Sequence, residues 1–312
     1  MKKILLTASL VLTVGLLSLS AFAQRVETES DLFNKISKLT QTKKTEDQKK
    51  AYDLSKIYIQ KFSNEDAEKV KKIKAFMENF EAAHLGKLID DGKTSEAFAF
   101  GKQILESSPD NSKVTMELAF AGFQAMERKK DKSFGKDSIE YAKTTLRLFG
   151  ENKLPKEFAP FSNQTEATAM MYFIIGNFLG EDNLQESAAN FYKSVQYDSQ
   201  VKMNFMPYYY IALYYHRTYE KLSAEFEKKY AGKSTDDKEA TAANEKLGKL
   251  LDLMMDAYAR AAKLGEEKKI EAASNWKAIF SQIYQGVKGS QAGMNEYYDK
   301  VFSQPLADPS TL

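Results

Sequence analysis

The chain has 312 residues, of which 45 are Lys or Arg, 43 are Asp or Glu, 43% are hydrophobic and none is cysteine. This composition is typical of a packed globular protein and excludes a collagen-like, strongly disordered or disulfide-stabilised chain. The lack of cysteine also excludes thiol nucleophiles and cysteine-based metal sites. The balance of charges gives no basic excess of the kind that binds nucleic-acid phosphates, so we expect no nucleic-acid partner.

Residues 1–23 have the pattern of a secretion signal. A basic start at Lys2-Lys3 precedes an apolar run over residues 4–19 and a small-x-small end at Ala21–Ala23. We therefore expect cleavage after Ala23 and a periplasmic or secreted protein. The alternative is a retained membrane anchor, because about 20 apolar residues can span a bilayer. The remaining chain has 43 basic and 43 acidic residues and no second apolar stretch of spanning length.

The sequence after the signal predicts α-helices almost throughout. Apolar residues recur every three or four positions, as at Leu54, Ile57 and Phe62, which is the spacing of one helical face. Turn sequences such as the one at Asp90–Gly92 separate helices of about a dozen residues or more. Pro207 fits the first turn of a helix, where its missing N–H has no intrahelical acceptor to lose.

A short sequence motif recurs along the chain. Residues 138–143 (SIEYAK), 188–193 (AANFYK) and 254–259 (MMDAYA) carry similar patterns of small and aromatic residues. Gly176 stands twelve positions before Ala188, a spacing that covers the end of one helix, a short turn and the start of the next. The sequence therefore predicts a string of helix hairpins.

This repeat resembles the tetratricopeptide repeat family, whose unit is about 34 residues in two antiparallel helices. Ile175-Gly176, Ala188, Tyr192 and Val195 match the small and aromatic positions of one unit. The resemblance implies an all-α fold that forms a right-handed α-α superhelix of about five to six helix hairpins. It places this solenoid over residues 24–303 and leaves residues 304–312 as a C-terminal tail.

One hairpin is longer than the repeat requires. The gap between Ala212 and Met254 exceeds the usual spacing by 30 residues, and both flanks are helical in composition. We expect an elongated hairpin over residues 205–264 with its tip at residues 231–236. It is either a longer packed pair or a contact arm that projects beyond its neighbours.

The concave face of such a solenoid is formed by the first helix of each unit and commonly binds a partner. The groove positions implied by the resemblance are Lys113, Met116, Phe120, Gln124, Phe173, Asn177, Tyr209, Leu213, His216 and Arg217. Their mixture of aromatic, amide and charged groups suits an extended peptide or a partner helix. Phe173 stands where chaperone-binding relatives carry a cation, so binding of a chaperone tail is not expected.

No catalytic or metal-binding motif is complete. The segments at Gly92-Lys93-Thr94 and Gly232-Lys233-Ser234 lack the first glycine of a phosphate-binding loop and are better interpreted as hairpin turns. His84 and His216 do not have the spacing that directs two ligands to one metal. We therefore expect no enzyme activity, no cofactor and no metal.

The sequence thus predicts an exported, non-catalytic adaptor that binds a protein or peptide through its groove. Two other functions stay open. The clustered tyrosines, as at Tyr208–Tyr210 and Tyr297-Tyr298, also suit a carrier for a glycan or an amphiphile. A third possibility is a structural protein that associates with itself.

Overall fold

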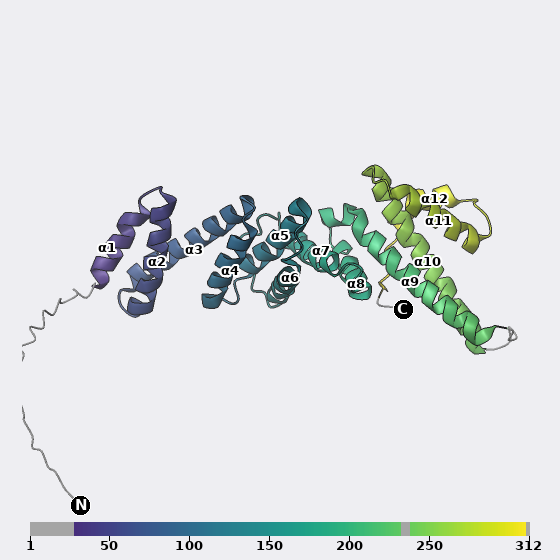
Figure 1. Ribbon diagram of the computed structural model, residues 1–312, viewed down its shortest axis with the longest axis horizontal. Coiled ribbons are helices and arrows are strands. Elements are labelled where there is room, and N and C mark those ends of the chain that lie inside the picture. The colour runs from purple at the N-terminus through teal and green to yellow at the C-terminus, as the bar shows by residue number, and fades with distance from the viewer. Residues whose placement is uncertain (1–27, 232–237, 310–312) are drawn as a thin grey trace, which may run out of the picture. The chain divides into compact units, whose positions relative to one another are not determined.

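The computed structural model describes residues 28–231 and 238–309 (Figure 1). These residues form twelve α-helices and two 3-10 turns, and none of them is in a strand, which confirms the predicted all-α class. The predicted signal at 1–23 and nearly all of the predicted hairpin tip lie outside the described residues. Within them, no helix is both long enough and apolar enough to cross a bilayer.

The helices follow one another with short connections. In chain order they are α1 (Glu29–Thr40), α2 (Thr45–Phe62), α3 (Ala67–Asp90), α4 (Thr94–Ser107), α5 (Ser112–Lys129), α6 (Gly135–Gly150), α7 (Gln164–Leu179), α8 (Leu184–Val195), η1 (Gln200–Met203), α9 (Phe205–Tyr230), α10 (Lys238–Glu267), α11 (Ala273–Lys288), α12 (Met294–Lys300) and η2 (Val301–Ser303).

Asparagine side chains start four of these helices. Asn111, Asn163, Asn183 and Asn204 accept a hydrogen bond from a backbone N–H in the first turn of α5, α7, α8 and α9, respectively. Such caps satisfy donors that have no partner inside the helix, which is why short polar residues favour these positions. Pro207 lies in the first turn of α9, as its sequence context predicts.

The chain divides into two compact units, and the first ends at Ala83. Its core is formed by buried residues of α1, α2 and α3, including Leu32, Ile36 and Tyr58. At its edge, Lys69 lies 2.8 Å from the carboxylate of Glu29, which also accepts a hydrogen bond from the Tyr58 hydroxyl. The first unit therefore has a hydrophobic core of its own.

The second unit begins at His84 and contains the end of α3 and helices α4 to α12. Each helix from α4 to α10 packs against the next one in the chain, and α5 also contacts α7. The largest core cluster extends from α7 to Leu306 and includes the fully buried Phe191, Tyr208, Tyr215 and Phe280. Contacts between sequence neighbours therefore build most of this unit.

Small residues lie where successive helices cross closely. A Cβ atom on Gly176 of α7 would come within 3.0 Å of the Phe191 ring of α8, and the Ser187 hydroxyl donates a 2.8 Å hydrogen bond to the Gly176 carbonyl. Ala188 is fully buried in the same crossing. Gly101 of α4 approaches Leu118 of α5 in the same way. At these crossings only a hydrogen atom fits between the helices.

Helices α9 and α10 form a long hairpin. Helices α9 and α10 have 26 and 30 residues, against 16 and 12 in α7 and α8, and they pack side by side (Figure 1). Helix α10 ends at Glu267, three residues beyond the predicted limit. Towards the distal end the hairpin is mostly exposed, with Ala240 and Leu247 as buried exceptions.

Residues 304–309 do not form a free tail. Leu306 is 8% exposed and belongs to the main core, and the Tyr215 hydroxyl donates a 3.3 Å hydrogen bond to the Ala307 carbonyl. The buried guanidinium of Arg260 donates a 2.7 Å hydrogen bond to the Gln304 carbonyl and two more to Asp256. An apolar side chain and two backbone carbonyls therefore attach this part of the predicted C-terminal tail to α9 and α10.

Candidate binding site on helix α5

Helix α5 presents one row of side chains to a cavity in the second unit. Lys113, Glu117, Phe120 and Gln124 are spaced by four, three and four residues, which places them on one helical face. A cavity of about 250 Å³ lies against this row. Three elements line it, namely the end of α3 with Gly86, Ile89 and Asp90, helix α5 with Glu117, Phe120 and Gln124, and the α6–α7 connection with Ala159 and Pro160.

Glu117 is the buried charge of this cavity. It is 9% exposed, and its Oε1 lies 3.0 Å from Nζ of Lys113. Its Oε2 is buried and accepts no hydrogen bond from any described residue. Burial raises the pKa of the Glu117 carboxyl, Lys113 opposes this shift, and the nearby Asp90 adds to it. A buried carboxylate oxygen without a donor is energetically unfavourable, so this atom marks the site.

Lys113 holds two elements of the cavity together. Besides its ion pair with Glu117, its ammonium group donates a hydrogen bond to the carbonyl of Ala159 in the α6–α7 connection. The Lys113 side chain is 23% exposed, so most of it is removed from water. Its ammonium group is therefore already engaged by a carboxylate and a carbonyl of the protein itself.

Phe120 and Gln124 supply the other α5 side chains of the cavity. The half-buried ring of Phe120 packs edge to face against Phe161, with 5.1 Å between ring centroids, and lies 6.3 Å from Phe123. These contacts fix the ring in the cavity wall. The amide of Gln124 makes no hydrogen bond to a described residue, so it keeps both donors and an acceptor for a ligand.

The structure brings together only part of the predicted groove. Phe120 and Gln124 line the α5 cavity and Lys113 lies beside it, whereas Met116 and Phe173 are 0% and 3% exposed and belong to the core. Neither of these two side chains presents surface to a partner. Their assignment to the groove is therefore corrected: Met116 faces α6 and α7, and Phe173 packs against Phe191 of α8.

The remaining predicted residues of α7 and α9 lie away from this cavity. The Asn177 amide is 3.9 Å from the sulfur of Met206, and Tyr209 stacks on Trp276 of α11 with 5.0 Å between centroids. Leu213 is half-buried. Nδ1 of His216 lies 2.9 Å from the hydroxyl oxygen of Tyr258.

Arg217 lies at a second, larger cavity of about 520 Å³. It forms an ion pair with Glu181, while Lys221 and Lys246 in the same cavity have no ion-pair partner in the described part of the chain. Tyr214, Leu184 and Leu222 give this cavity an apolar wall. It is therefore basic and partly apolar, whereas the α5 cavity is acidic and partly apolar.

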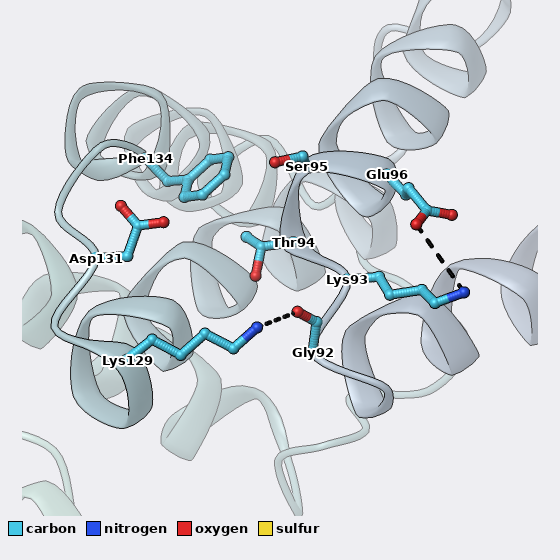
Figure 2. Close-up of a pocket in the computed structure, with 8 residues that line it drawn as sticks. All are labelled: Gly92, Lys93, Thr94, Ser95, Glu96, Lys129, Asp131 and Phe134. Atoms are coloured by element: carbon cyan, nitrogen blue, oxygen red, sulfur yellow. Dashed lines mark hydrogen bonds and ion pairs between the residues drawn. The ribbon is translucent and has the colours of Figure 1, made fainter.

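A third cavity, of about 240 Å³, surrounds the α3–α4 turn at Gly92-Lys93-Thr94 (Figure 2). Gly92 has a φ of +67° and lies in the turn that follows the end of α3 at Asp90, as the turn interpretation predicts. Lys129 donates a 2.6 Å hydrogen bond to the Gly92 carbonyl, and Lys93 lies 3.9 Å from Glu96 (Figure 2). Both cations of this cavity are thus paired within the protein, and a helix rather than a strand precedes the turn.

The sequence analysis did not identify Glu117. The residue stands four positions after Lys113, and such a pair usually lies on a solvated helix face. The available signal was its place in the row between Lys113 and Phe120. Elsewhere, no group of three His, Asp or Glu side chains within residues 28–231 and 238–309 is arranged to hold a metal ion.

Comparison of the chain with protein-family models, with curated proteins and with solved structures gave no match.

Proposed function

We propose that this protein is an exported, non-catalytic adaptor that binds an extended segment of a partner protein along α5. The cavity at Glu117 carries this proposal. It combines a rigid aromatic wall at Phe120, an unengaged amide at Gln124 and a buried carboxylate. Apolar anchors supply affinity in peptide recognition, and polar groups fix the register of the peptide.

The size of the cavity favours a polypeptide segment over a whole small molecule. Pockets for small molecules usually measure roughly 300–1,000 Å³. The α5 cavity, at about 250 Å³, is smaller and suits a single side chain. The rest of a bound segment then lies outside the cavity and uses the surface around it.

A displayed library of random peptides tests the binding function directly. The purified protein is panned in parallel with a Phe120→Ala, Gln124→Ala double variant and with a Lys221→Ala, Lys246→Ala control at the second cavity. We expect enriched peptides that bind the protein and the control but not the α5 variant. Peptides that bind all three equally, or no enrichment at all, would refute the α5 site. Circular-dichroism melts verify that both variants are folded.

Export is the second component of the proposal. The pattern of residues 1–23 supports it, and the intact mass of protein expressed in a bacterial host tests it. We expect a chain that starts at Gln24 and is recovered from the periplasm or medium, and Leu12→Arg in the apolar run should block this processing. A membrane-bound chain that keeps residues 1–23 would instead establish the anchor.

The second cavity supports a carrier as the alternative function. Its volume of about 520 Å³ falls within the usual range for small-molecule sites, and Lys221 and Lys246 stand beside an apolar wall. The probe is dodecanoate, whose carboxylate suits the lysines and whose chain suits Tyr214 and Leu222. Saturable binding that is lost in a Lys221→Gln, Lys246→Gln variant would favour the carrier. Binding that is unchanged in this variant, or absent, would argue against it.

A further inference from the structure

We infer that the α5 cavity receives a cationic side chain, arginine or lysine, from the bound polypeptide. The inference rests on the proposed function and specifies the chemistry of the partner. It is carried by the carboxylate of Glu117, which is nine-tenths buried and has one oxygen without a donor.

The charge of the cavity selects a cation. Its lining contains two carboxylates, at Asp90 and Glu117, and no basic side chain. Lys113 lies beside it, but its ammonium is engaged by Oε1 of Glu117 and by the Ala159 carbonyl. One negative charge of the site therefore has no opposite charge, and Oε2 of Glu117 lacks a donor. An ammonium or guanidinium group supplies the missing positive charge and the missing hydrogen-bond donor. Hydrogen bonds between charged groups are stronger than those between neutral groups.

The walls of the cavity suit the rest of such a side chain. Ile89, Phe120, Ala159 and Pro160 provide apolar surface. The side chains of arginine and lysine are apolar up to the charged group, so they can lie along such a wall and place the charge at its end. The ring of Phe120 adds attraction for a cation that passes over its face.

Other side chains fit less well. An acidic side chain would be repelled by Asp90 and Glu117. An apolar side chain would fill the space but leave Oε2 of Glu117 without a donor, which is the unfavourable outcome for a buried polar atom. When a cationic side chain occupies the cavity, the amide of Gln124 in the cavity lining can form hydrogen bonds with the backbone of the bound segment.

Amino-acid amides test this specificity independently of any partner. The full chain is titrated with N-acetyl-arginine amide, N-acetyl-lysine amide, N-acetyl-norleucine amide and N-acetyl-glutamate amide, and binding is followed by NMR shifts of labelled α5 residues. We expect saturable shifts at the α5 cavity with the two cationic amides. Norleucine amide has the apolar chain without the charge and should bind at least tenfold more weakly, and glutamate amide should not bind.

Glu117→Gln keeps the shape of the side chain and removes its charge. We expect it to weaken binding of arginine amide roughly ten- to a hundredfold, as is typical for loss of a hydrogen bond between charged groups. Glu127→Gln is the matched control, because Glu127 is exposed on the same helix. It should leave the affinity unchanged. A melt by circular dichroism verifies the fold of both variants.

Three outcomes would overturn the inference. The first is equal binding of norleucine and arginine amides, and the second is equal binding of arginine amide to the protein and to Glu117→Gln. The third is the absence of cavity binding by any amide, when displayed peptides either bind α5 without a fixed basic residue or do not bind at all. Failure of the peptide library combined with Glu117-dependent binding of arginine amide would refute the adaptor function but not the cation site. If neither amides nor peptides bind, both are refuted.

Discussion

Gly265 and Gly248 lie in the same helix but have opposite surroundings. A Cβ atom on Gly265 would approach Cβ of Ala273 and the ring of Trp276 to 2.9 Å, whereas a Cβ atom on Gly248 would have no neighbour within 4 Å. The first contact involves a Cβ atom that moves only with its backbone. Gly265 therefore permits the close crossing of α10 and α11, while Gly248 only adds conformational freedom to the unfolded chain.

This difference predicts opposite effects of one substitution. Gly265→Ala should destabilise the protein by about 1–3 kcal/mol, because it overpacks the crossing. Gly248→Ala should stabilise it by about 0.5–1 kcal/mol, because alanine favours an exposed helix interior. Urea unfolding followed by circular dichroism measures both. Equal effects of the two substitutions would show that Gly265 is not the close contact of this crossing.

The buried carboxylate of Glu117 makes stability depend on pH. Because its pKa is raised on folding, the folded protein binds this proton more tightly than the unfolded chain, whose reference value is 4.5. The stabilising effect of the proton is complete below that value and is lost as the pH rises through the folded pKa. We therefore expect the melting temperature of Glu117→Gln, minus that of Glu127→Gln, to increase as the pH is raised from 4 to 8.

Thermal melts of the two variants at several pH values measure this difference. Both variants lose one negative charge from the same helix, so changes in overall charge cancel in the comparison. The groups nearest to Glu117, Lys113 and Asp90, are unchanged in both. A pH-independent difference would mean that the carboxylate of Glu117 does not titrate differently in the folded protein.

The sequence placed part of the predicted groove on helix α5, but it identified only some of the residues at the candidate cavity there. Lys113, Phe120 and Gln124 were found because groove positions recur with the helical period. Met116 was wrong because the same period also passes through residues that pack on the neighbouring helices. Glu117 was missed because the cavity that it lines is completed by Ala159 and Pro160, which follow it by more than forty residues and whose position the sequence does not reveal.

At the scale of elements, the segment after η2 belongs to the core. Leu306→Ala should destabilise the protein by about 2 kcal/mol, because it removes buried methyl groups that pack in the main cluster. Leu154→Ala is the control, since Leu154 is 40% exposed, and it should change stability by less than about 0.5 kcal/mol. Chemical unfolding compares the two. A small effect of Leu306→Ala would show that the segment after η2 adds little to the stability of the core.

At the same scale, the bounds of the long hairpin were largely predictable and the position of the C-terminal segment was not. The extra length between Ala212 and Met254 is visible as a break in the repeat, and the composition on both sides is helical. The packing of residues 304–309 depends on Arg260, Tyr215 and other side chains far away in the sequence. No local pattern marks such a contact.

At the scale of the whole molecule, the two units have separate cores. The buried cluster of the first unit contains residues between Leu32 and Ile73. The buried residues of the three other clusters all lie at or after Leu85 in the sequence. Periodicity predicted the all-α class, because a helical face can be recognised within one segment. The division at Ala83 was not predicted, because it falls inside the continuous helix α3, where no turn or change in composition marks it.

Separate cores predict separate opening of the units. Ile36→Val should destabilise the first unit by roughly 0.5–1.5 kcal/mol and speed hydrogen exchange there about two- to tenfold. Exchange of core amides in α7 to α11 should stay unchanged. Ile211→Val, which alters a fully buried residue of the second unit, should have the reverse pattern. Faster exchange throughout the chain with either variant would mean that both units open together.

The contact between Trp276 and Tyr209 also has a spectroscopic consequence. Trp276 is the single tryptophan of the chain, and it is buried in the second unit between aromatic rings. Its fluorescence therefore reports the unfolding of that unit alone, whereas circular dichroism sums the helices of both. If the units melt at different temperatures, the two curves will not coincide, and the gap between them will measure the difference in their stability without any label or substitution.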